Sequence, residues 1–156
     1  MMRPISAEDT APILALAESV GLFSLEEVEQ LRPMVEEAVA DGEGQRPFWL
    51  VDAADDGLVS VAYCEPERMA EGTWNLQLIA VRPDCQGQGR GGTMLEAVKQ
   101  ELLAQGARLL LVDTLGSDEF ESVRKFYRSQ GFVEEARIRD FYAEGADKVT
   151  FRKALS

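Results

Sequence analysis

The stretch from Leu78 to Val98, LIAVRPDCQGQGRGGTMLEAV, constrains the fold of this chain most strongly. An apolar run stopped by Pro83 is followed by a loop with four glycines, which leads into a segment with apolar residues at helical spacing. Glycines let a backbone approach a ligand closely, and the N–H groups at a helix N-terminus bind anions. The stretch therefore predicts a strand, a phosphate-binding loop and a helix, which together indicate an α/β domain.

The glycines fit two phosphate-binding patterns. Read as Gly87-x-Gly89-x-x-Gly92, they match the dinucleotide fingerprint of a Rossmann unit. Asp113 also lies about where the ribose-binding acid of that unit belongs. Against this interpretation, RPDCQ separates the strand from the first glycine, and only one further helix follows Asp113, too little for two βαβαβ halves.

The second pattern, Gln86-x-x-Gly89-x-Gly91, resembles a loop of the GNAT superfamily of acyl-CoA-dependent N-acyltransferases. That family has a strand, a Q/R-x-x-G-x-G/A loop and a helix, as in VRPDCQGQGRGG. It also has a later helix with an aromatic–tyrosine pair and a glycine–aromatic turn, as in SVRKFYRSQGF. The resemblance is strong over about residues 72–153, and it implies acetyl-CoA as acyl donor rather than a dinucleotide.

The rest of the chain predicts elements in the order β-α-α-β-β-β-α-β-α-β-β. This is the order of a GNAT-like single α/β domain over residues 1–156, with a central mixed, mostly antiparallel sheet flanked by helices. The apolar run ARLLLVDT is typical of a strand buried on both faces. The expected elements are a strand at 3–5, a helix opened by Ser6 and Asp9 and ending near Ser19, a helix opened by Ser24 and Glu27 and closed by Gly42, a hairpin at 47–67, a strand at 72–83, a helix at 89–106, a strand at 107–114, a helix at 117–131, and strands at 132–142 and 147–155.

Composition excludes several classes of function. The net charge of −12 argues against nucleic-acid binding, and no apolar run is long enough to span a membrane. The chain has no histidine, which excludes Ser-His-Asp and Cys-His hydrolases. Its two cysteines form no metal-binding spacing, so we expect no metal and a cytoplasmic location with both thiols reduced.

The resemblance implies which residues bind the cofactor. The strand before the loop lends backbone groups to the pantetheine arm, and the loop binds the two phosphates. Phe126 is a candidate contact whose alternative role is core packing. Arg82, Arg90, Arg124 and Lys125 are either local positive charge for the anionic cofactor or ordinary solvated charges. The implied cofactor-binding residues are Ile79, Ala80, Val81, Gln86, Gly87, Gln88, Gly89, Arg90, Gly91, Gly92 and Phe126.

The resemblance also implies catalytic roles. Tyr127 would protonate the departing CoA thiolate; its alternative role is aromatic packing. The position that carries a base in some members falls on Asn75, an amide that can only position a water. In others the base ends the next strand, which here is Asp113, equally a helix cap. Glu65 and Glu71 are weaker candidates.

Two departures from the family pattern accompany these roles. An asparagine that many relatives carry early in the tyrosine-bearing helix is missing near Phe120, although Ser117 or Ser122 could substitute. Cys85 lies outside the expected thioester position. We therefore expect direct transfer in a ternary complex rather than an acyl-cysteine intermediate.

The acceptor is expected to be a primary amine of a small molecule or peptide. Acidic residues in the loops that would form its cleft suit an amine, although solvated turns explain them equally well. The alternative function is a non-catalytic acyl-CoA-binding or sensor domain, and a homodimer is possible. The acidic residues are Glu65, Glu67, Glu71, Asp140 and Glu144.

Overall fold

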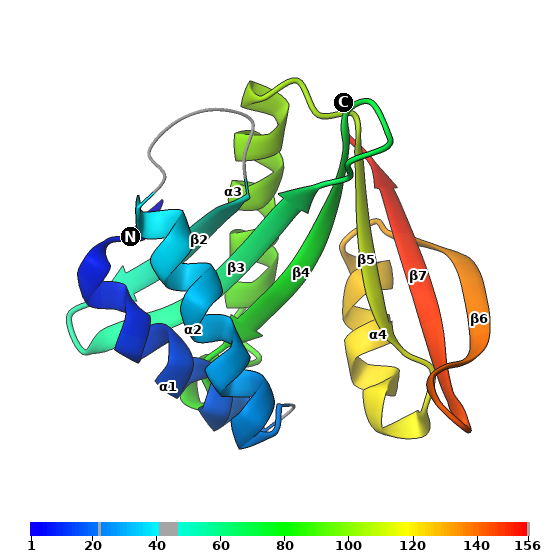
Figure 1. The fold of residues 1–156 in the computed structure, drawn as a ribbon, viewed down its shortest axis with the longest axis horizontal. Helices are drawn as coiled ribbons and strands as arrows, with labels where there is room; N and C mark the ends of the chain where they lie inside the picture. Colours follow the sequence, from blue (N-terminus) through cyan, green and yellow to red (C-terminus); the bar gives the residue numbers. More distant parts are fainter. Residues whose placement is uncertain (22, 41–46, 156) are drawn as a thin grey trace.

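The structure is a computed structural model, and it describes residues 1–21, 23–40 and 47–155. Its centre is one mixed sheet of seven strands in the order β1-β2-β3-β4-β5-β7-β6 (Figure 1). Neighbouring strands are antiparallel, except for the parallel pair β4–β5. The strands are β1 (Met2–Pro4), β2 (Phe48–Ala54), β3 (Gly57–Pro66), β4 (Thr73–Val81), β5 (Leu109–Leu115), β6 (Val133–Ala143) and β7 (Ala146–Ala154).

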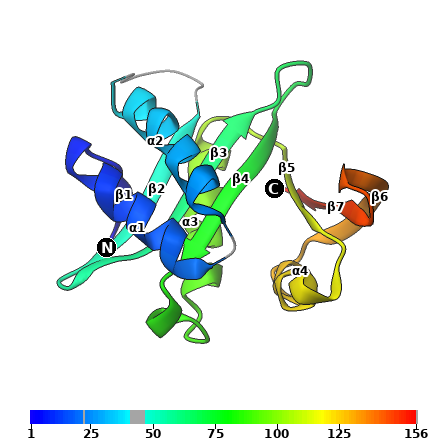
Figure 2. The ribbon, with the colours of Figure 1, turned by 60° about the horizontal axis from the view of Figure 1, so that its bottom comes forward.

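The four α-helices of the described residues pack unevenly on this sheet. Helices α1 (Thr10–Val20) and α2 (Leu25–Ala40) cover one face of strands β2, β3 and β4. Helices α3 (Arg90–Ala104) and α4 (Glu121–Ser129) lie on the opposite face. Figure 2 shows that none of the described helices covers the other face of β5, β7 and β6. The sheet therefore has one half covered on both sides and one half covered on one side.

Each covered face has its own apolar core. The core beneath α1 and α2 includes Ile13, Val35 and Trp49, and the Trp49 ring stacks on Tyr63 with ring centroids 4.5 Å apart. The core beneath α3 and α4 includes Met94 of α3 and Tyr127 of α4. This second core runs across the boundary between the two halves of the sheet and so holds them together.

Local sequence signals explain where the first two helices begin. Ser24 and Glu27 form the expected capping box, because the Glu27 N–H donates to Ser24 Oγ (3.1 Å) and the Ser24 N–H donates to Glu27 Oε1 (3.2 Å). At the earlier signal, the Ser6 N–H donates to Asp9 Oδ2 (2.7 Å), and a 3₁₀ turn at Ala7–Asp9 precedes α1. The expected closing residue of the second helix, Gly42, lies outside the described residues.

The expected fold class and element order are confirmed, and one expectation about burial is wrong. Strand β5 is not buried on both faces: Leu110 and Val112 are buried, whereas Leu109 and Leu111 are half-buried and Asp113 is exposed. The reason is that α4 covers only one face of this strand. The expected helix over 117–131 begins as a 3₁₀ turn at Asp118–Phe120 and becomes α-helical at Glu121.

Candidate active site

The sheet opens between β4 and β5. Their parallel pairing runs from Thr73 with Leu109 to Leu76 with Val112 and then stops. Beyond this point β4 stays paired with β3, while its other edge has no strand partner within the described chain (Figure 1). Backbone N–H and C=O groups need hydrogen-bond partners. Apart from the Val81 carbonyl, which accepts a hydrogen bond from the Gln86 side chain, the free edge over residues 77–81 therefore presents such groups to a ligand.

A β-bulge lies at the opening. Tyr63 pairs with Leu78 but Cys64 pairs with Leu76, so Gln77 is an extra residue in β4. Leu76 belongs to the core beneath α3 and α4, whereas Leu78 belongs to the core beneath α1 and α2. Since side chains alternate along a strand, Gln77 and Leu78 both lie on the α1–α2 face.

The glycine-rich loop connects this strand to α3. Gly87 and Gly89 have φ angles of 74° and 78°, which favour glycine, and nothing lies within 4 Å of where their Cβ atoms would be. Within the described residues, no protein group accepts a hydrogen bond from the backbone N–H groups of 87–92. The loop thus presents successive free donors at a helix N-terminus, an arrangement that fits a phosphate.

Side chains hold the loop in this shape. Gln86 Nε2 donates to the Val81 carbonyl (3.0 Å), and Gln88 Nε2 donates to the Asp84 carbonyl (3.2 Å). A Cβ on Gly91 would lie 2.9 Å from Cζ of Phe126 on α4, so this glycine permits close packing of the two helices. Both glutamines and Phe126 therefore support the loop through contacts within the protein.

Three of the four basic residues expected near the cofactor are already engaged. Arg90 Nη1 lies 3.3 Å from Oδ2 of the buried Asp52, and Arg82 pairs with Asp84 and with an acid of the β2–β3 turn. Arg124 is buried and donates to backbone carbonyls at the end of β5. Lys125 is exposed and has no ion-pair partner in the described part of the chain. Most of the basic side chains thus shape the site, and the loop donors carry the anion-binding character.

Tyr127 is buried on α4 among three aromatic rings. The ring centroids of Phe126, Phe132 and Phe151 lie 5.5, 5.5 and 5.7 Å from its own. Burial raises the pKa of Tyr127, so its phenol stays protonated at neutral pH. Among the described residues none hydrogen-bonds to its hydroxyl, which leaves this proton available to a ligand.

Asn75 and Asp113, the other expected catalytic residues, both have protein partners. Asn75 Nδ2 donates to Glu67 Oε2 (2.8 Å). Thr150 Oγ1 donates to Asp113 Oδ1 (2.7 Å), and Lys148 Nζ lies 3.6 Å from the other Asp113 oxygen. Asp113 lies on the uncovered face of β5, because the neighbouring buried residues of that strand face Tyr127.

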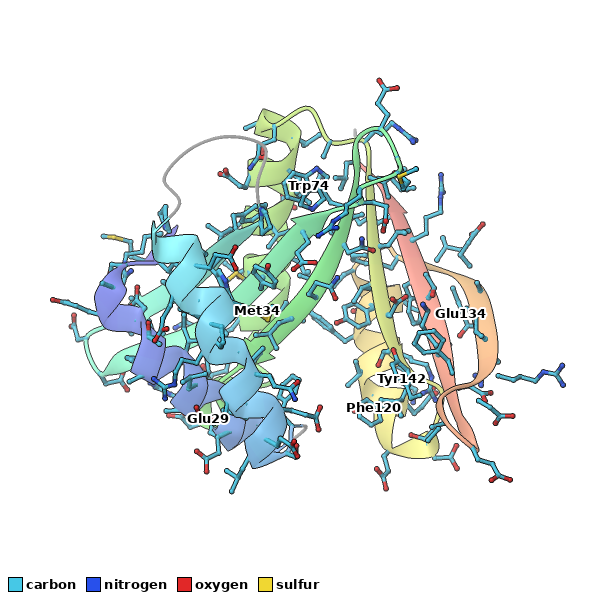
Figure 3. The ribbon with its side chains drawn as sticks, in the orientation of Figure 1. Glu29, Met34, Trp74, Phe120, Glu134 and Tyr142 are labelled. Atoms are coloured by element: carbon cyan, nitrogen blue, oxygen red, sulfur yellow. The ribbon has the colours of Figure 1, made fainter. Side chains whose placement is uncertain are left out.

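The β6–β7 hairpin borders the same uncovered face. Asp140 has a φ of 55° and accepts a hydrogen bond from the Gly145 N–H (2.8 Å), so this acid shapes the turn. The next two residues, Phe141 and Tyr142, form an edge-to-face pair (5.0 Å). Burial, and then the charge of Asp113, raise the pKa of Tyr142, which extends from the hairpin beside β5 (Figure 3).

Sequence reasoning missed two residues at the opening. Tyr63 donates to Glu65 Oε1 (2.6 Å), and Gln77 Nε2 lies 3.5 Å from Glu65 Oε2. The alternation of side chains along β3 and β4 indicates on which face of the sheet each residue lies. It does not reveal the bulge at Gln77 that brings them together.

Metal sites and membrane-spanning helices are both absent from the described residues. No group of three or more His, Cys, Asp or Glu side chains there is placed to hold a metal ion. None of the helices described is both long enough and apolar enough to cross a membrane.

Fold and loop together place the chain among transferases that use coenzyme A. The family model of the acetyltransferase (GNAT) domain matches residues 44–134, more than half of the chain. The chain therefore belongs to the GNAT family of acetyltransferases and is an N-acetyltransferase. The resemblance seen in the sequence is confirmed, and the Rossmann interpretation of the glycine loop is not supported.

Solved structures agree with this assignment. A protein from Desulfovibrio desulfuricans, described as an acetyltransferase of the GNAT family, superposes with a TM-score of 0.95 at 30% identity, covering 100% of this chain and 99% of that one. Ribosomal-protein-alanine N-acetyltransferase from Brucella melitensis (0.79, 21% identity, 99% of each chain) and an aminoglycoside 6′-N-acetyltransferase complexed with coenzyme A (0.78, 12% identity, 100% and 97%) share the fold. No match was found among curated proteins.

Proposed function

We propose that this enzyme transfers the acetyl group of acetyl-CoA to a primary amine of a small molecule or peptide, by direct attack in a ternary complex. The observation that carries the proposal is the row of free backbone N–H groups over residues 87–92, beside the unpaired edge of β4. A pyrophosphate at the loop places the rest of an acyl-CoA along that edge, where strand backbone is available to the pantetheine arm.

The cofactor contacts follow from this placement. Gly87, Gln88, Gly89, Gly91 and Gly92 offer backbone donors to the phosphates. Gln86, Arg90 and Phe126 support the loop through the contacts that they make within the protein. Ile79, Ala80 and Val81 provide strand backbone to the pantetheine arm.

Tyr127 is proposed as the general acid. As the amine forms its bond to the carbonyl carbon, the C–S bond breaks and the sulfur needs a proton. A buried phenol with a raised pKa and a free hydroxyl is suited to donate one. The sulfur electron pair takes this proton, and the phenol regains it from solvent.

We propose that the amine loses its proton on the face of the sheet opposite Tyr127. Asp113 borders this face, held by Thr150 and Lys148, and we propose that it positions the acceptor or a water there. Asn75 is proposed to hold a water at the opening through its amide.

Isothermal titration with acetyl-CoA, NAD and NADPH tests the cofactor. Gly89→Glu should abolish acetyl-CoA binding, because it places a strained, anionic side chain in the loop. Met69→Glu, which adds the same charge at a site that is 94% exposed, should leave binding intact. Circular dichroism confirms that both variants fold. Binding of a dinucleotide in place of acetyl-CoA would contradict the proposal.

Transfer is tested by release of free CoA thiol with a panel of amines. Two enzymes that share this fold are named as acetyltransferases of ribosomal-protein alanine and of aminoglycosides. The panel therefore includes an N-terminal alanine peptide, an aminoglycoside and simple alkylamines. Tyr127→Phe should lower kcat about 10²–10⁴-fold and leave acetyl-CoA binding unchanged. Tight acetyl-CoA binding with no turnover of any amine would favour the alternative, an acyl-CoA sensor.

A further inference from the structure

Glu65 of β3 lies directly opposite Asn75 of β4 in the antiparallel register. Residues opposite each other in such a pair point to the same face, with Cβ atoms roughly 4.5–5.5 Å apart. Asn75 occupies the position where a base is expected, but its amide cannot accept a proton. Strand β3 therefore places the Glu65 carboxylate beside Asn75, the position in β4 that lacks a base.

The Glu65 carboxylate is also held at the point where the sheet opens. Gln77, the bulge residue of β4, contacts one of its oxygens, and the Tyr63 hydroxyl donates to the other at 2.6 Å. Pairing of β4 with β5 ends one residue before Gln77. The carboxylate therefore lies beside the bulge of β4 on the α1–α2 face, at the level where β4 separates from β5.

Tyr63 is a rigid support for this carboxylate. It is buried and stacked on Trp49, so its ring has little freedom. Burial raises the pKa of Tyr63, and the hydrogen bond to Glu65 raises it further. The phenol consequently keeps its proton and donates it in the hydrogen bond, so that Glu65 remains the acceptor of the pair.

The other acids nearby are less suited to take a proton. One Asp113 oxygen accepts a hydrogen bond from Thr150 Oγ1, and the other lies beside the ammonium group of Lys148. Glu67 is exposed and bound to Asn75. Glu65 is half-buried, and among the residues that the structure describes its second oxygen has only the long contact of 3.5 Å with Gln77.

We propose that Glu65 is the general base of the reaction and that Tyr63 and Gln77 are its positioning residues; this rests on the acetyl transfer proposed above. A water bridges the amine and the carboxylate. The N–H bond breaks toward this water while the nitrogen electron pair forms the N–C bond. Glu65 gains one proton, the CoA sulfur gains another from Tyr127, and solvent restores both residues.

The test compares Glu65→Gln with the wild-type enzyme, using the best amine of the panel. Glutamine keeps the shape of the side chain and an oxygen for Tyr63, so the fold and the acetyl-CoA Kd should not change. We expect kcat to fall about 10²–10⁴-fold. The deficit should shrink as pH rises toward the pKa of the amine, because free amine then needs no base. A folding defect would not show this rescue.

Two further variants make the result specific. Glu101→Gln removes the same charge from an exposed position near the C-terminal end of α3, and its kcat should match the wild type. Tyr63→Phe should lower kcat about tenfold, because the carboxylate loses a charge-assisted hydrogen bond.

Other outcomes overturn the inference. If Glu65→Gln keeps kcat within about threefold of the wild type while Asp113→Asn loses it, the base is Asp113. If both variants keep kcat, water alone takes the proton. If the wild-type enzyme acetylates no amine, the proposed function fails and this inference fails with it.

Discussion

The two halves of the sheet differ in how they are covered. In β3, which has helices on both faces, seven consecutive residues from Leu58 to Cys64 are buried. In β6, at the other end of the sheet, all eleven residues are exposed. The covered half supplies most of the apolar burial, whereas the half with one open face is held to it through the core beneath α3 and α4. The site lies where the two halves separate, so one side is rigid and the other is open to an acceptor.

Paired aromatic truncations test this difference most directly. Trp49→Ala in the covered half should lower the free energy of unfolding by about 3–5 kcal/mol, because it leaves a large cavity. Phe141→Ala on the open face, where the side chain is 52% exposed, should cost less than about 0.5 kcal/mol. Urea denaturation measures both. Equal losses would show that the open half contributes as much stability as the covered one.

A buried cation stabilises the open half at the start of α4. Arg124 donates to the carbonyls of Leu115 and Ser117 at 2.7 and 2.8 Å. Arg124→Met leaves these acceptors unpaired and should cost about 2–3 kcal/mol in urea denaturation. The control Lys125→Met removes the same charge from the next, exposed residue and should cost nearly nothing. A loss below about 1 kcal/mol for Arg124→Met would mean that water replaces the arginine.

The covered half has a polar contact with a defined pH dependence. Hydrogen bonds from Arg3 lower the pKa of the buried Asp9 below its ordinary value. A carboxyl whose pKa is lower in the folded state contributes stability above its unfolded pKa of about 3.9 and loses it as pH falls through the folded value. Asp9→Asn should therefore cost about 1–2 kcal/mol at pH 7, and the difference from wild type should persist down to about pH 4 and shrink only as pH falls further, through the lowered folded-state pKa. A difference that is constant with pH would contradict this assignment.

The smallest expected effect concerns the phosphate loop. Asp52 is buried under α3 and holds Arg90, the first residue of that helix. Asp52→Asn should raise the acetyl-CoA Kd about three- to tenfold, because the helix start and its N–H donors become less well oriented. Asp56→Asn, which removes one of the two acidic partners of Arg82 at the exposed β2–β3 turn, is the matched control. Equal Kd values for wild type and Asp52→Asn would show that the loop keeps its binding conformation without the Asp52–Arg90 ion pair.

The open face explains why β5 is buried on one face only, although its sequence predicts burial on both. A run such as LLLV is typical of a strand buried on both faces. Here Leu109 and Leu111 are only half-buried, because α4 covers one side. Composition along one strand cannot report which neighbours cover it.

The sequence by itself determined the order of the elements, the glycine loop before α3 and the helix that carries Tyr127. These follow from periodicity, caps and glycine positions, which act over a few residues. Tertiary structure alone decided that β4 separates from β5 after Leu76, that Arg90 turns inward to Asp52, and that Glu65 stands opposite Asn75. The physical reason is that strand register, bulges and ion pairs join residues far apart in the chain. A pattern within a few consecutive residues does not indicate which distant residues they will contact.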